Sequence, residues 1–141
     1  MAWPRRFLGL PLHPMLVHFP LVCWLSMPVF DAMALVRGPD PWWGIALGMT
    51  AIGVVIGALA LTTGLLEYIH LSETGSNNVR LAAEHGIRNT VIWCVQLGKL
   101  IAAIWVPAGG VFIAACLVVD VLSCALLVQS AWFGTRIAYG G

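Results

Sequence analysis

The sequence has 141 residues, of which 60% are hydrophobic and only 9% are charged, and its formal net charge is +1. A soluble domain carries roughly 25% charged residues and roughly 45–50% apolar ones, so neither a soluble enzyme nor a disordered chain is expected. A near-neutral chain without a basic patch gives no indication of a nucleic-acid partner. The composition therefore predicts an integral membrane protein with one domain over residues 1–141.

Four stretches are long and apolar enough to cross a bilayer, which takes about 20 residues each. They cover about residues 15–36, 42–66, 84–106 and 109–133. Gly and Pro cluster in residues 37–41 and 107–110, and residues 72–80 are the longest polar stretch, so the connections are expected there. The sequence predicts an all-α membrane four-helix bundle with both termini on the same side. We call this end, which also holds the 72–80 connection, side A, and the other end side B.

The distribution of cations predicts the orientation of the bundle. We interpret the first apolar stretch as a retained helix and not as a signal peptide. The positive-inside rule places side A in the cytoplasm, because it holds five arginines against one arginine and one lysine toward side B. These residues are Arg5, Arg6, Arg80, Arg88 and Arg136 on side A, and Arg37 and Lys99 toward side B. The expected location is the bacterial inner membrane, with both termini cytoplasmic.

All four histidines fall at side A under this topology. His13 and His18 flank the start of the first helix, His70 follows the second, and His85 opens the third. Ligating residues at membrane depth are candidates for function, although interfacial histidines are also ordinary.

The third helix carries one polar stripe on an otherwise apolar surface. Its members are His85, Asn89, Ile92, Gln96 and Lys99, at helical spacing. In lipid such a stripe must face the bundle interior or a wet cavity. It serves either as interhelical hydrogen bonding or as part of a functional site.

The second helix has a complementary face of small residues. Ala46, Thr50, Gly53, Gly57, Ala60 and Gly64 recur at helical spacing. Such a face allows close helix packing, and a flat ring between helices would use the same geometry.

These features together suggest a b-type haem, which needs two neutral imidazoles from facing helices, an apolar slot and cations near its propionates. We expect His18 and His85 as the axial ligands of the iron, with His13 and His70 as alternates. Arg80 and Arg88, or the N-terminal arginines, would lie near the propionates, and Asn89 would lie beside His85. His13 and His18 are five residues apart, about 140° around a helix, so they are not expected to bind one metal together.

A second polar group lies closer to side B. Asp31 and Lys99 are each about 10 Å from that end of their helices, and Asp120 lies somewhat deeper. An ion pair between Asp31 and Lys99 would offset the cost of burying either charge, and a proton path is the alternative interpretation.

Residues 12–20 read Leu-His-Pro-Met-Leu-Val-His-Phe-Pro. This string resembles the HPxxVHFP motif that opens members of the DUF2231 family, which are small membrane proteins with four predicted helices. Residues 64–68 are similar to the family's Gly-x-x-Asp-Tyr, with Glu67 in place of the aspartate, and His85 with Asn89 resembles the start of its third helix. The glycine- and tyrosine-bearing end of the chain is also similar. Some members are fused to Rieske-type domains, so the resemblance implies a redox partner.

The sequence therefore predicts a haem b subunit that carries electrons within a larger respiratory or photosynthetic membrane complex. It is not expected to be an enzyme, since bis-histidine ligation leaves no open coordination position. One alternative is a non-redox accessory subunit that binds lipid or a chlorophyll-type pigment, or no cofactor. Another is a proton- or ion-translocating protein that uses Asp31, Lys99 and Asp120. The expected partners are membrane lipids, other membrane subunits and a redox partner.

Overall fold

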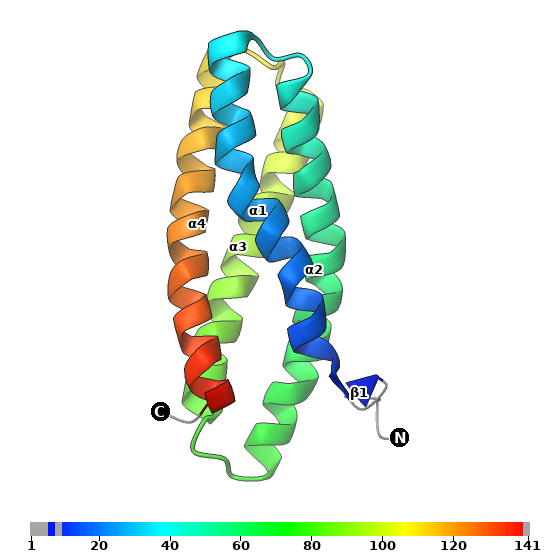
Figure 1. The fold of residues 1–141 in the computed structure, drawn as a ribbon, viewed down its shortest axis with the longest axis vertical. Helices are drawn as coiled ribbons and strands as arrows, with labels where there is room; N and C mark the ends of the chain where they lie inside the picture. The colour runs from blue at the N-terminus through cyan, green and yellow to red at the C-terminus, as the bar shows by residue number, and fades with distance from the viewer. Residues whose placement is uncertain (1–5, 8–9, 140–141) are drawn as a thin grey trace.

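The computed structural model describes residues 6–7 and 10–139. Four helices follow one another: α1 (Leu12–Arg37), α2 (Trp42–Glu73), α3 (Val79–Trp105) and α4 (Gly110–Tyr139). Two short antiparallel strands, β1 (Arg6–Phe7) and β2 (Leu10–Pro11), precede α1. The helices alternate in direction, so α1 begins and α4 ends at side A (Figure 1). The predicted all-α four-helix bundle is confirmed; Arg5 of the charge count lies outside the described residues.

The surface of the bundle is apolar, as a membrane protein requires. Each of the four helices is long and apolar enough to cross a bilayer. Large apolar side chains point outward from every helix, including Val22, Val55, Ile104 and Val118. Such surface is unfavourable in water but matches lipid. The chain is a multi-pass membrane protein whose outer surface contacts lipid.

The helices extend further than hydropathy alone predicts. At side A, α2 continues to Glu73 and α3 begins at Val79, so residues 72–73 and 79–80 are helical and the predicted connection is shorter. Likewise α4 continues well past residue 133. The reason is that hydropathy marks the edge of the hydrocarbon layer, whereas a helix ends where its backbone must turn. Gly75, with a φ of 64°, supplies that turn between α2 and α3.

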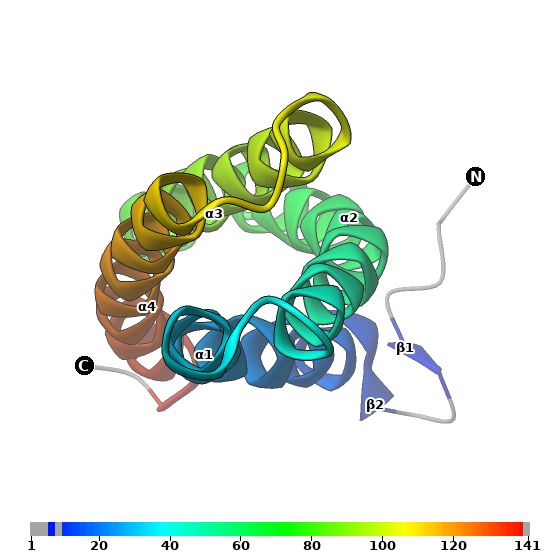
Figure 2. The same ribbon diagram turned by 90° about the horizontal axis from the view of Figure 1, so that it is seen from above.

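The four helices form a ring in the order α1, α2, α3, α4 when the bundle is viewed along its axis (Figure 2). As a result, α1 and α3 lie diagonally across the interior. The small-residue face of α2 packs against α1, and the Trp24 indole lies directly on Gly53 and Gly57. Trp93 of α3 donates its indole N–H to the Val54 carbonyl at 2.8 Å.

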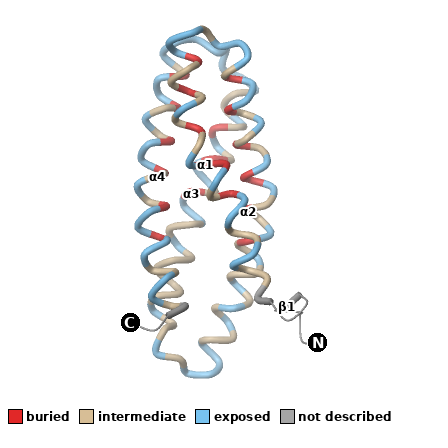
Figure 3. The backbone as a smooth tube through the Cα atoms, viewed as in Figure 1, coloured by how far each residue is buried: buried red, intermediate tan, exposed pale blue. Residues whose placement is uncertain are grey.

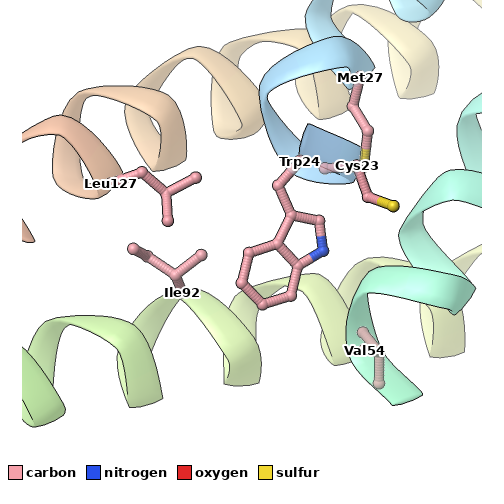
Figure 4. Close-up of a cluster of buried hydrophobic side chains, with 6 residues drawn as sticks. All are labelled: Cys23, Trp24, Met27, Val54, Ile92 and Leu127. Carbon is pink, nitrogen blue, oxygen red and sulfur yellow. The ribbon is translucent and has the colours of Figure 1, made fainter. Parts of the chain in front are cut away.

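The buried side chains lie in the middle of the bundle and toward side B. One apolar cluster comprises Cys23, Trp24, Met27, Val54, Ile92 and Leu127 (Figure 4). A second, nearer side B, comprises Ala34, Trp43, Ala46, Ile113 and Cys116. Toward side A, the described residues before 20, after 60 on α2, before 92 on α3 and after 130 are only half-buried or exposed (Figure 3). The interior of the bundle is thus closely packed except at the histidine end.

The close approach of α1 to α2 predicts a steric test. We expect Gly53→Ala to lower the free energy of unfolding by about 1–3 kcal/mol, because the added methyl group would overlap the rigid Trp24 indole. Gly48→Ala, on the same helix with nothing near its added methyl group, should leave stability unchanged or raise it. Thermal unfolding of both variants in detergent, followed by circular dichroism, measures the difference. Equal stability of the two variants would contradict this packing.

Candidate histidine site

Two histidines face each other across the interior at side A. His13 is the second residue of α1, and His85 lies in the second turn of α3, on the diagonal helix. Their ring centroids are 6.0 Å apart, and the ring planes are at 88°. The structure thus brings together one predicted ligand, His85, with the alternate His13.

Both rings are held by backbone carbonyl groups of neighbouring helices. His13 Nδ1 lies 2.9 Å from the Ala60 carbonyl oxygen of α2, and His85 Nδ1 lies 2.8 Å from the Ser130 carbonyl oxygen of α4. Because a carbonyl oxygen only accepts, each Nδ1 carries the proton and donates it. In each ring the Nε2 atom is therefore the one that carries the lone pair. This is how metal-binding histidines are usually oriented, with the second ring nitrogen donating to a carbonyl.

A glycine lies against each ring. A methyl group at Gly64 of α2 would lie 2.8 Å from His13 Cε1, and one at Gly134 of α4 would lie 3.2 Å from His85 Cε1. The missing side chains are therefore what allow the two imidazoles to sit inside the bundle.

Asn89 and Ser130 complete the surroundings of His85. The Asn89 amide nitrogen lies 3.1 Å from His85 Nε2, 2.9 Å from the His85 carbonyl oxygen and 2.8 Å from Ser130 Oγ. An amide NH₂ group has two hydrogens, so three acceptors compete for them. Asn89 can consequently release Nε2 and still donate to its two other acceptors.

The remaining two histidines lie elsewhere. His18, the expected partner of His85, is exposed on the outer side of α1, so the structure does not bring these two predicted ligands together. The reason is that α1 already begins at Leu12, which places His13 on the helix and the side chain of His18 about 140° away. His70 is half-buried, six residues or about 9 Å beyond Gly64 toward the α2–α3 connection.

The two arginines predicted near the site lie on α3, within about two turns of His85. They line a hollow of about 370 Å³ with Leu81, Glu84 and Phe133. Arg88 forms an ion pair with Glu84, and its guanidinium lies 4.4 Å from the Phe133 ring centroid. Arg80 is exposed. Both cations lie toward the side-A end of α3, and Arg88 is already neutralised in part by Glu84.

A separate buried polar cluster lies toward side B. Lys99 Nζ donates to Asp31 Oδ2 at 3.0 Å and to Asp120 Oδ2, and Gln96 Nε2 donates to Asp120 Oδ1 at 3.0 Å and to Ser123 Oγ at 3.3 Å. The predicted Asp31–Lys99 pair is confirmed, and Asp120 is its third member. Lys99 lies fourteen residues from His85 on α3, about 21 Å along the axis. Apolar side chains fill the bundle between them, so the two polar sites are separate.

A family model described as "Predicted membrane protein (DUF2231)" matches residues 9–141. The chain belongs to the DUF2231 family. No curated protein and no solved structure matches it. In this DUF2231 chain, the segments on which the resemblance was based meet at side A: His13, Gly64, and His85 with Asn89 surround one site.

Two contributors to this site, Ser130 and Gly134, were not predicted from the sequence. A signal for them exists in α4, where one helical face carries small and polar residues that continue to Gly134. That face is Ile113, Cys116, Asp120, Ser123, Leu127, Ser130 and Gly134, at steps of three and four. Pairing this face of α4 with the polar stripe of α3 predicts that Ser130 lies near His85.

The bonds of the two rings predict their tautomers. In ¹⁵N-histidine NMR of the protein in detergent, His13 and His85 should both appear as neutral rings protonated at Nδ1. Gly64→Ala should shift the His13 signals more than those of His85, because the added methyl group would displace the His13 ring directly. Gly86→Ala, with open space at its added methyl group, is the matched control. Protonation of either ring at Nε2 instead would refute the arrangement.

Proposed function

We propose that this chain binds one b-type haem between His13 and His85 and carries electrons as a subunit of a larger respiratory or photosynthetic membrane complex. The observation that carries the proposal is the pair of facing imidazoles from diagonal helices, each with its Nδ1 bonded to a backbone carbonyl.

The spacing of the rings fits two axial ligands of one metal. Metal–imidazole bonds are about 2.0–2.1 Å long, and a ring nitrogen lies about 1.1 Å from the ring centre, so two trans imidazoles have centroids about 6 Å apart. The separation of 6.0 Å matches this value. Two rings in direct edge-to-face contact have centroids about 4.5–7 Å apart, so the test below separates ligation from packing alone.

The number of donors favours a porphyrin over a metal held by the protein alone. Within the described part of the chain, no group of three His, Cys, Asp or Glu side chains could hold a metal ion. Two axial imidazoles are the donor set that a haem iron takes when its macrocycle fills the other four positions. Such a group supplies one-electron redox chemistry, and with both axial positions filled it offers no site for substrate.

The surroundings of the pair suit a flat, largely apolar group with an anionic edge. Gly64 and Gly134 give the rings space, and the side-A interior is only half-buried. Asn89 has alternative acceptors when Nε2 of His85 is taken. Arg80 and Arg88 stand at the membrane boundary, where propionates would be neutralised.

A chain of this size with one such group needs a donor and an acceptor of electrons, so the proposal includes redox partner subunits in the membrane. The proposed location is the bacterial inner membrane with side A in the cytoplasm, as the arginine count predicts.

Absorption spectra of the purified protein before and after dithionite test the proposal. We expect a Soret band and a sharpened α-band on reduction. His13→Ala and His85→Ala should each abolish the low-spin spectrum, because each removes one axial ligand. His18→Ala is the matched control, on the same helix but exposed, and should keep the full spectrum.

A colourless wild-type protein that cannot be loaded with haem would reject the proposal. Red-region absorption would instead indicate a chlorophyll-type pigment on the same histidines. Loss of the spectrum in His18→Ala alone would return the ligand to the residue first expected from the sequence.

A further inference from the structure

Three ionisable side chains meet inside the membrane, and the proposed haem site uses none of them. Asp31 of α1, Lys99 of α3 and Asp120 of α4 are 0%, 6% and 0% exposed. Lys99 forms an ion pair with each of the two carboxylates.

The charges of the cluster do not balance. With every group ionised, two carboxylates face one ammonium, which leaves a net charge of −1. The second helix adds no charge, since residues 42–66 contain none. The other titratable neighbours are two thiols of α4, Cys116 and Cys124. An uncompensated charge at this depth is strongly unfavourable, and one additional proton would remove it.

The hydrogen bonds distinguish the two carboxyl groups. Both oxygens of Asp120 accept, Oδ1 from Gln96 and Oδ2 from Lys99, which stabilises its ionised form. Asp31 accepts only at Oδ2, and its Oδ1 is buried without a partner. The additional proton therefore belongs on Asp31 Oδ1.

A second buried atom in the same cluster points the same way. Gln96 is 0% exposed, and its Oε1 also has no partner. Oε1 can only accept, whereas a protonated Asp31 Oδ1 becomes a donor. Adding one proton to Asp31 Oδ1 turns one of these two unpaired acceptors into a donor, in a cluster that otherwise has a surplus of acceptors.

We propose that the Asp31–Lys99–Asp120 cluster is a binding site for one exchangeable proton, held by Asp31, while Asp120 is the counter-ion of Lys99. Asp31 lies six residues from the end of α1, about 9 Å from side B. Toward side A, Trp24, Met27 and Ile92 separate it from the histidines. Side B is therefore the nearer end of the bundle for exchange of this proton, and the site is not part of a path through the bundle.

Infrared spectroscopy of the protein in lipid tests this assignment. At neutral pH, the wild type should show the C=O band of one protonated carboxyl group, which moves to lower frequency in D₂O. Asp31→Asn should remove the band. Asp40→Asn, the same change at an exposed loop residue, should leave it unchanged. A wild type without the band, or a band that survives in Asp31→Asn, would overturn the proposal.

Two further variants keep the test decisive where Asp31→Asn fails to fold. In Asp120→Asn, Lys99 and Asp31 balance each other, so Asp31 should ionise and the band should vanish although Asp31 is still present. In Lys99→Met, both carboxyl groups lose their cation, and the band should roughly double. A band that persists in Asp120→Asn, or stays single in Lys99→Met, would contradict the assignment of one shared cation.

Discussion

The contacts of Lys99 with Asp31 and Asp120 determine how three of the four helices are turned about their axes. Lipid is as apolar as leucine, so burial of apolar side chains does not select the inward face of a membrane helix. Buried charges do select it, because a charge left facing hydrocarbon is expensive, and breaking a buried ion pair by removing one partner costs about 3–5 kcal/mol. The inward faces of α1, α3 and α4 follow from these contacts.

The position of the histidine site at side A follows from these inward faces of α1 and α3. His13 precedes Asp31 by eighteen residues, which is five turns, so both side chains lie on one face of α1. His18 precedes Asp31 by thirteen residues and points about 140° away from it. On α3, His85 lies fourteen residues before Lys99, only about 40° from it around the helix. The polar cluster near side B therefore aligns His13 with His85 near side A.

The sequence was sufficient for the spans, for the inward polar stripe of α3 and for the Asp31–Lys99 pair, because each depends on the cost of polar groups in lipid. On α1 it favoured His18, whereas the structure places His13 opposite His85, because the helix already begins at Leu12. Pro14 is compatible with the first turn, where the missing N–H has no helical partner in any case. Ser130 was missed because its role depends on which carbonyl of α4 lies opposite His85, and only the packed helices show that.

The two polar sites differ in how closely the surrounding residues pack. The cluster near side B is enclosed by close-packed apolar residues, which is the environment that holds a single proton. The histidine end is half-buried, with glycines against both rings and two arginines nearby, and it is there that a larger group is proposed to bind.

Electron paramagnetic resonance of the oxidised protein tests the bis-histidine account most directly. Axial imidazole planes at 88° would leave two iron orbitals nearly equal in energy, which gives a low-spin ferric signal dominated by one large g value. We predict this strongly anisotropic signal in the wild type and its absence in His13→Ala. A high-spin signal in the wild type would contradict ligation by two histidines, and a three-line rhombic low-spin signal would contradict their perpendicular arrangement.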